Sequence, residues 1–576
     1  MVEDLGGAER APEEVQVTDP GFLVTGDPHE VAARLATAAG PAARLAAAVY
    51  RASLEVHGAA DAATRRQILA LDAARFGDRA LAARLAEAAV EQVPDARWRV
   101  DWATGSGVHP AYLGPLGAAD GAWPPPLVGV EGRPAALTRD ADGALLLRDP
   151  ATGDPLLRPA AGGRAPGEEC TAVLDGRPVT VRCDGYTAPR LLDPLTGGTL
   201  GTLAAAPGVE PDPTPSAVVT VVIDGRPHVL GCDEERFTLW DLTTRRPVRE
   251  IEPFEKDDLQ AWAVAEPGGR PQVVAGSYGG SVGVWDLTSG ERLAEARAED
   301  RDLWRMAVAE VGGRPRVLTV GSNPYVGEPL EEAELWSLDP LRRLDRLPVG
   351  WGELTTAAAH GRCWVVSEGG RAWELSDAAP ADRRAPGHRA HVRALASMVL
   401  DGRPVAVSGG DDEVLRLWDL DSGEPVGPPL STAPYQDEWE GVTAVRTVLA
   451  DGRAYAVASH VDAYENVVQR VWDLAAGAEA GPPVAGAVAR DAADDLPAAV
   501  AAPAPDGLTA AAAGTVGGRP VALFAVRHRV QVWDLSGEPV VTGELAFPQP
   551  VAALAVTPDG RVLAGFGEDL ALLSPR

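Results

Sequence analysis

The chain has 576 residues and a formal net charge of −31, because 83 acidic residues stand against 52 basic ones. Lys256 is the single lysine, so arginine carries nearly all of the positive charge. Since binding to a nucleic-acid backbone depends on neutralising phosphates with Lys and Arg, this balance argues against a nucleic-acid partner.

The N-terminus and the hydropathy predict a cytoplasmic protein. Residues 1–16, MVEDLGGAERAPEEVQ, lack the basic flank and the apolar centre of a signal peptide. No apolar run reaches the ~18 residues that a membrane helix needs. We therefore expect a soluble, cytoplasmic protein that has no membrane partner.

The first 110 residues are predicted to form a tail, a helical bundle and a linker. Residues 1–26 are acidic and poor in large apolar side chains, which is typical of disorder. From Asp27-Pro28, a helix cap followed by a first-turn proline, Leu and Ala recur every three or four residues. This pattern predicts a bundle of four short α-helices over residues 27–94. Residues 95–110 then form a linker.

From residue 111 the chain repeats a Gly-Arg turn about every 44 residues, which is the period of a four-stranded propeller blade. Around Asp401-Gly402 an alternating strand leads into the turn, and this dipeptide suits a tight hairpin that needs positive φ. Three further short strands complete the unit. The glycines of the ten turns are Gly132, Gly176, Gly225, Gly269, Gly313, Gly361, Gly402, Gly452, Gly518 and Gly560.

Five units end their third strand with a tryptophan and an aspartate, and Gly387-His388 precedes the seventh unit. These motifs resemble the WD-repeat family over about residues 110–576. The resemblance implies a mainly β fold, a β-propeller, with blades held by a hydrogen-bond set of His, Ser, Asp and Trp. The structural blade residues that it implies are His388, Asp412, Trp418, Trp240, Trp285, Trp472 and Trp533. Gly410 stands at the serine position, so aliphatic stacking is expected to hold most blades.

The number of units raises the question of how the array closes. Ten units exceed the usual four to eight blades. A single closed ring is favoured, and one conventional ring with a partial second ring is the alternative. The last unit supplies three strands, and residues 111–117, AYLGPLG, are expected to add the fourth. The predicted propeller thus spans residues 111–576.

The helical region carries a second resemblance. Residues 49–85, followed by WRVDWATGS at 98–106, resemble the segment that joins the ATPase to the propeller in large actinobacterial signalling NTPases. The resemblance implies a bacterial signalling protein that holds the sensor half without its motor. A phosphate-binding loop needs G-x-x-x-x-G-K-[ST], and Lys256 has no glycine near it. No nucleotide partner is therefore expected.

Two short motifs touch on catalysis or metal binding. Ser281 lies in a G-x-S-x-G sequence but runs directly into a predicted strand, whereas a nucleophile elbow needs a strand-to-helix turn. His388-x-x-His391 has no third ligand at a diagnostic spacing. The four cysteines form no C-x-x-C pair and are expected to pack as small apolar residues. We therefore expect no catalytic residue, no metal ligand and no cofactor.

The predicted binding surface is the face on which the loops between strands two and three, and those between blades, open. Aromatic residues there would be typical anchors of a protein interface, although they fill gaps between blades equally well. Acids beside them, including Asp411, Asp412 and Asp437, predict a basic protein segment as the partner. The candidate residues of this protein-binding face are Trp304, Tyr325, Trp351, Tyr435, Trp439 and Tyr464.

These patterns predict a non-catalytic scaffold for protein–protein interaction, or a sensor module detached from an ATPase. The alternative is a propeller enzyme with a metal or redox cofactor in its central channel. Acids or histidines that converge on the axis from several blades would favour the enzyme, and a channel of small aliphatic residues would favour the scaffold.

Overall fold

The computed structural model shows a mainly β protein, with 55% strand and 13% helix. No helix in the described ranges is long and apolar enough to cross a membrane. The structure describes residues 17–37, 39–91, 97–116, 126–131, 133–139, 145–152, 154–161, 166–204, 215–233, 235–254, 258–298, 302–322, 332–349, 354–359, 362–375, 384–431, 439–450, 453–462, 467–480, 484–485 and 507–576.

The N-terminal region is a bundle of short helices, several of which begin at an aspartate that caps the helix N-terminus. Asp27 accepts hydrogen bonds from the N–H groups of His29 and Glu30, and Pro28 occupies the first turn, as its sequence predicts. The helices are α2 (Pro20–Thr25), α3 (Pro28–Ala36), α4 (Pro41–Ala52), α5 (Leu54–His57), α6 (Ala62–Arg75) and α7 (Arg79–Ala86).

Helix α2 corrects the expected disorder of residues 1–26. Asp19-Pro20 repeats the cap and first-turn pair of α3, since the Asp19 side chain accepts the Phe22 N–H at 2.9 Å. Leu23 and Val24 are buried. The prediction of disorder is therefore wrong for residues 17–26, and residues 1–16 lie outside the described part of the chain.

The hairpin turns follow the sequence prediction. Asp401 has φ of 49° and Gly402 has φ of 80°. The same pair of positive values recurs at Asp175-Gly176 and Asp224-Gly225. Two successive residues with positive φ match the right-handed twist of the flanking strands, so each turn joins the first two strands of a tight antiparallel hairpin.

The strands of the described residues form ten antiparallel sheets, and six of these make up what we call the N-terminal arc. These sheets are β3 (Leu127–Val130), β4 (Arg133–Arg139), β5 (Leu145–Arg148), β6 (Pro155–Leu157); β8 (Glu169–Leu174), β9 (Arg177–Arg182), β10 (Arg190–Leu192), β11 (Thr199–Thr202); β12 (Ala217–Ile223), β13 (Arg226–Cys232), β14 (Phe237–Asp241), β15 (Arg246–Ile251); β16 (Leu259–Ala265), β17 (Gln272–Ser277), β18 (Ser281–Asp286), β19 (Arg292–Arg297); β20 (Asp302–Val311), β21 (Arg314–Ser322), β22 (Glu332–Leu338), β23 (Leu341–Pro348); and β24 (Leu354–Ala359), β25 (Arg362–Ser367), β26 (Arg371–Leu375) with β2 (Tyr112–Pro115) and β7 (Ala160–Ala161).

The other four sheets form the C-terminal arc. They are β27 (Val392–Leu400), β28 (Arg403–Gly410), β29 (Val414–Asp419), β30 (Leu430–Ser431); β31 (Trp439–Ala450), β32 (Arg453–Asp462), β33 (Val467–Asp473), β34 (Ala478–Glu479), β35 (Val484–Ala485); β36 (Ala510–Val516), β37 (Arg519–Val526), β38 (Arg529–Asp534), β39 (Val540–Ala546); and β40 (Val551–Val556), β41 (Val562–Phe566), β42 (Asp569–Pro575) with β1 (Trp98–Ala103).

The strand that completes the last sheet is not the one that the sequence suggested. β1 pairs with β42, so residues 98–103, which were assigned to the linker 95–110, supply the fourth strand. The expected strand at 111–117 exists as β2, but it pairs with β26 in the N-terminal arc. One short stretch of chain therefore gives a strand to each arc.

Shared apolar cores show which sheets are neighbours. In a single ring in chain order, the sheet of β24–β26 would pack on that of β27–β30. Instead Trp364 of β25 shares a core with Leu137 of β4, and Trp418 of β29 shares one with Leu572 of β42. Closure of one ring of ten is thus not seen among the described residues. The shared cores divide the described sheets into two groups, and one conventional ring with a partial second ring stays a prediction.

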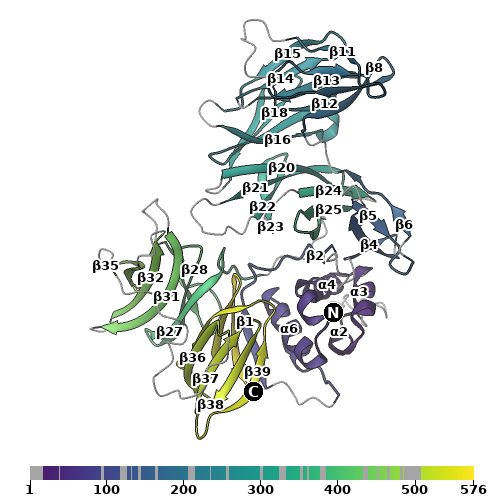
Figure 1. Cartoon of the computed structure of the whole chain (residues 1–576). Helices are drawn as coiled ribbons and strands as arrows, with labels where there is room; N and C mark the ends of the chain where they lie inside the picture. Colours follow the sequence, from purple (N-terminus) through teal and green to yellow (C-terminus); the bar gives the residue numbers. More distant parts are fainter. Residues whose placement is uncertain are drawn as a thin grey trace, which may run out of the picture.

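The helical bundle lies between the two arcs (Figure 1). Helices α6 and α7 contact β1 of the C-terminal arc, whereas α4 contacts β2 and α3 contacts β3 of the N-terminal arc. Apolar residues of the bundle, such as Leu69, form one continuous core with Phe547 and Phe566 of the last two sheets. The bundle is therefore integral to the fold and is not an appended domain.

Candidate binding site

Most of the predicted structural residues pack as the WD-like pattern implies. Trp240, Trp285, Trp418 and Trp472 are buried, while Trp533 is partly buried. Each lies in the third strand of its sheet. The aspartate that follows caps a turn: Asp241, for example, accepts the N–H groups of Thr243 and Thr244 at 2.7 and 2.9 Å. These Trp-Asp pairs hold the sheets together.

The hydrogen-bond set of the seventh unit is complete, which corrects one sequence assignment. His388 lies 2.8 Å from Asp412 through Nδ1 and 2.6 Å from the Ser408 hydroxyl through Nε2, and the Trp418 indole donates to Ser408 at 2.7 Å. The serine position is therefore Ser408 and not Gly410. A Cβ at Gly410 would lie 2.4 Å from the His391 carbonyl oxygen, so close backbone approach explains the glycine.

Asp412 serves this structural set and is not free for a partner. Burial raises the pKa of its carboxyl, but the attraction to His388 and the hydrogen bonds from His388 and the Arg389 N–H outweigh burial and hold the pKa below its usual value. Its side chain is only 6% exposed. The sequence-based placement of Asp412 among surface acids is therefore wrong.

The predicted protein-binding face is largely untested. Trp304 is the third residue of β20 and Trp439 is the first of β31, but their side chains are outside the described part of the structure. Tyr325, Trp351, Tyr435 and Tyr464 also lie outside the described residues, as does Asp437. Their role in binding remains a prediction.

The structure instead presents a cavity in the C-terminal arc, which the sequence did not reveal. It has a volume of about 860 Å³ and lies where the first strands of four sheets, β27, β31, β36 and β40, begin. Residues far apart in the chain meet there. Its lining consists of His391, Arg393, Asp411, Thr443, Thr509, Gln549, Pro550, Val551, Ala552 and Gly567.

An ion pair forms one side of this cavity. The Arg393 guanidinium lies 2.8 Å from Asp411 Oδ2 through Nη2 and 2.9 Å through Nε. His391 Nδ1 is 3.9 Å from the same oxygen. The Asp411 carboxylate is thus already compensated by a cation of the chain, and a basic ligand would have to share it with Arg393.

The remaining polar groups of the cavity are mainly hydrogen-bond acceptors. Thr509 donates its hydroxyl proton to the Val551 carbonyl at 2.6 Å, and Thr443 donates to the Ser459 carbonyl at 3.2 Å, so their oxygen lone pairs remain. The Gln549 carboxamide oxygen is buried and, within the described residues, accepts no hydrogen bond. Such a lining favours a ligand that brings N–H donors.

A metal or hydrolase site finds no further support in this geometry. Both ring nitrogens of His388 are engaged by Asp412 and Ser408, so His388 and His391 do not face a common ion. Ser281 begins strand β18, as the sequence indicated. Among the described residues there is no group of three or more His, Cys, Asp or Glu side chains that could hold a metal ion.

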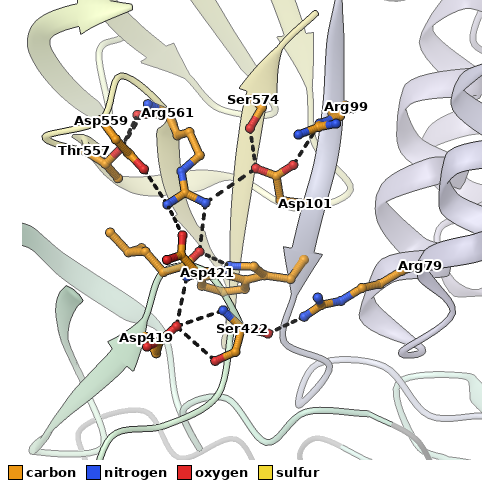
Figure 2. Close-up of polar contacts among 12 residues, drawn as sticks. Arg79, Arg99, Asp101, Asp419, Asp421, Ser422, Thr557, Asp559, Arg561 and Ser574 are labelled. Carbon is orange, nitrogen blue, oxygen red and sulfur yellow. Dashed lines mark hydrogen bonds and ion pairs between the residues drawn. The ribbon is translucent and has the colours of Figure 1, made fainter. Parts of the chain in front are cut away.

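Hydrogen bonds and an ion pair link the sheet β27–β30 to the last sheet, β40–β42 with β1, and both sheets line the cavity (Figure 2). Arg561, which precedes β41, donates to the Leu420 carbonyl at 3.0 Å and pairs with Asp421 at 3.0 Å. The Trp102 indole of β1 donates to the same carbonyl at 3.0 Å, and Arg79 of α7 donates to the Ser422 carbonyl. The turn after β29 is therefore held by the last sheet and by the bundle.

Comparisons with known proteins add little. No protein-family model and no curated protein matches the chain. Among solved structures it is similar to U3-55K at 13% identity, over 72% of this chain and 96% of that one, with a TM-score of 0.24. It is also similar to the computationally designed Ika8 protein at 16% identity, over 73% and 98% of the two chains, with a TM-score of 0.22. At these TM-scores neither similarity bears on function.

Proposed function

We propose that the chain is a non-catalytic scaffold for protein–protein interaction, built on WD-type blades, and that it binds its partner at the cavity of the C-terminal arc. The observation that carries the proposal is the convergence of four sheets on one cavity of about 860 Å³. That volume is within the range of ligand pockets, roughly 300–1,000 Å³. A protein segment that inserts side chains there would meet a rigid wall from every sheet of the arc.

The chemistry of the lining supports a partner that donates hydrogen bonds. The hydroxyl oxygens of Thr443 and Thr509 retain lone pairs, and the buried Gln549 carboxamide oxygen becomes a further acceptor when its side chain rotates toward the cavity. Backbone N–H groups or a basic side chain of an inserted segment would satisfy them. The basic partner inferred from the surface acids receives less support from Asp411, whose charge is compensated by Arg393. An uncharged donor segment fits the cavity equally well.

Affinity capture with cavity-filling variants tests the proposal. Ala552 lines the cavity, and Ala552→Trp would occupy it. Ala475, exposed in the turn after β33, provides a matched control, Ala475→Trp. We expect the wild type and the control variant to capture the same protein from the native host, and Ala552→Trp to lose it while keeping its circular dichroism spectrum. Equal capture by both variants would place the partner elsewhere.

Metal analysis addresses the alternative enzyme class. If the protein is a non-catalytic scaffold, we expect the purified protein to carry no stoichiometric metal ion. A bound ion at one equivalent, lost together with a reaction in the Asp411→Asn variant, would favour a propeller enzyme with its centre in the cavity.

A further inference from the structure

The cavity and the helical bundle meet at one turn of the last sheet. Residues 567–568 join β41 to β42, which begins at Asp569. Gly567 lines the cavity, and its carbonyl accepts the Val392 N–H at 2.7 Å, which ties it to the strand that carries Arg393. Two residues later the Asp569 side chain is fully buried on the side of the bundle. The two environments are therefore separated by two peptide bonds.

Asp569 links the bundle to the last sheet through hydrogen bonds and an ion pair. Its Oδ1 accepts the Ser106 N–H at 2.7 Å and the Thr104 hydroxyl at 3.1 Å. Its Oδ2 accepts the Gly107 N–H at 3.2 Å and Nε of Arg75, the last residue of α6, at 2.9 Å. Arg75 is 1% exposed. Arg75 also pairs with the buried Asp72 at 2.9 Å, so displacing Arg75 would leave two buried carboxylates without their cation, and small shifts of this turn are costly.

Gln549 lies between the cavity and the residues that bind Asp569. It lines the cavity, and its Oε1 is so close to Gly567 that a Cβ there would lie 1.6 Å away. A Cβ at Gly107 would lie 3.7 Å from its Nε2 and 3.1 Å from Asp569 Oδ2. The Oε1 acceptor is buried against Gly567 and unsatisfied among the described residues, so a donor in the cavity can reach it only if the carboxamide rotates toward the cavity and away from Gly107.

We infer that Gln549 and the turn 567–569 couple occupancy of the cavity to the position of α6 and of residues 104–107. The role of a bound partner in this coupling rests on the proposed function, but the coupling itself is a property of the protein without a ligand. Linkage requires it to act in both directions: a change at the cavity alters the bundle, and a change at the bundle alters the cavity.

Hydrogen–deuterium exchange of the full chain, followed by mass spectrometry, tests the inference without a ligand. Gln549→Ala should speed exchange of peptides from α6 and from residues 104–107 by about threefold or more, since contacting residues in one network are coupled. Arg75→Lys should in turn speed exchange at residues 388–393 and 549–552. Thr443→Val, which changes the part of the lining that β31 contributes, is the matched control and should leave α6 unchanged.

Each result has one meaning. If Gln549→Ala disturbs the fold as a whole, seen as loss of the native circular dichroism spectrum, Gln549→Asn tests the same contact with a smaller change. Faster exchange at α6 in either variant, with the control unchanged, supports the coupling. Changes confined to the mutated side in both directions would overturn it. Partner capture that is lost in Ala552→Trp while exchange shows no coupling would keep the proposed function and reject only this inference.

Discussion

The sheet β40–β42 and the sheet β8–β11 have the same antiparallel topology but very different surroundings. The first is completed by β1, packs against neighbouring sheets on both faces and contributes to the core of the bundle. All five residues of its strand β41 are buried. The second shares a core only with β12–β15 among the described residues, and three of the six residues of β9 are exposed. The stability of a blade therefore depends on its neighbours more than on its own hydrogen bonds.

The largest effect is expected when the strand and the bundle that cover the last sheet are removed. Deleting residues 1–103 takes away β1 and half of the shared core, and leaves the β42 edge and an apolar face open. We expect this variant to aggregate, because unpaired edges recruit other strands. Deletion of residues 1–16 is the control and should stay soluble, as judged by size-exclusion chromatography. A soluble, monomeric 1–103 deletion would show that the last sheet does not need its cover.

A pair of leucine truncations compares the two sheets directly. Leu572 of β42 is fully buried, whereas Leu200 of β11 is 47% exposed. We expect Leu572→Ala to lower the free energy of unfolding by about 2–5 kcal/mol, through lost burial and a residual cavity. Leu200→Ala should change it by less than about 0.5 kcal/mol. Urea denaturation followed by circular dichroism measures both, and similar losses would contradict the difference in packing.

A third test concerns the sheet beside the last one. Ser408 accepts hydrogen bonds from Trp418 and pairs with His388, so Ser408→Ala leaves two buried groups unsatisfied. The expected loss of stability is about 1–3 kcal/mol. In the N-terminal arc, Thr319 accepts only the Trp336 indole N–H at 2.9 Å, so Thr319→Val should cost less. The opposite order in urea denaturation would mean that the complete His–Ser–Trp set adds no stability.

The smallest expected effect depends on pH. Burial raises the pKa of Glu568 well above its usual value, Asp569 and Glu332 raise it further, and Arg75 and Arg371 oppose the shift. The unfolded chain releases this proton near its ordinary pKa, so the contribution of Glu568 to stability is present at low pH and is lost as pH rises toward the folded pKa. Glu568→Gln should therefore exceed the wild type by on the order of 1 kcal/mol at pH 8 and much less at pH 4.5. A difference that is the same at both pH values would contradict this role.

The sequence predicts the local units well because their signals are local. Asp-Gly turns, helix caps and Trp-Asp ends depend on residues a few positions apart, and the structure places them as expected at Asp401, Asp27 and Trp418. No local sequence pattern indicates which strand an edge strand pairs with. WRVDWA at 98–103 alternates like a strand, but nothing in it says that it pairs with β42 while the next strand pairs with β26.

The cavity escaped prediction for a similar reason. Its polar residues, such as Thr443, Thr509 and Gln549, are unremarkable in sequence and come together only because four strand beginnings converge. Ser408 was missed because Gly410 was read as the serine position. The correct serine is recognisable only from its place on β28, next to β29, which carries Trp418. Tertiary contacts define both features.

The pairing of β1 with β42 has a consequence for synthesis. A ribosome makes β1 among the first strands of this sequence and β42 only after both arcs have been translated. At usual rates of elongation this interval is on the order of tens of seconds. During that time the edge of β1 lacks β42, and the side of the bundle that packs on the last two sheets is uncovered, so the nascent chain offers a long-lived binding surface to a chaperone. The last sheet can therefore be completed only after β42 has been translated.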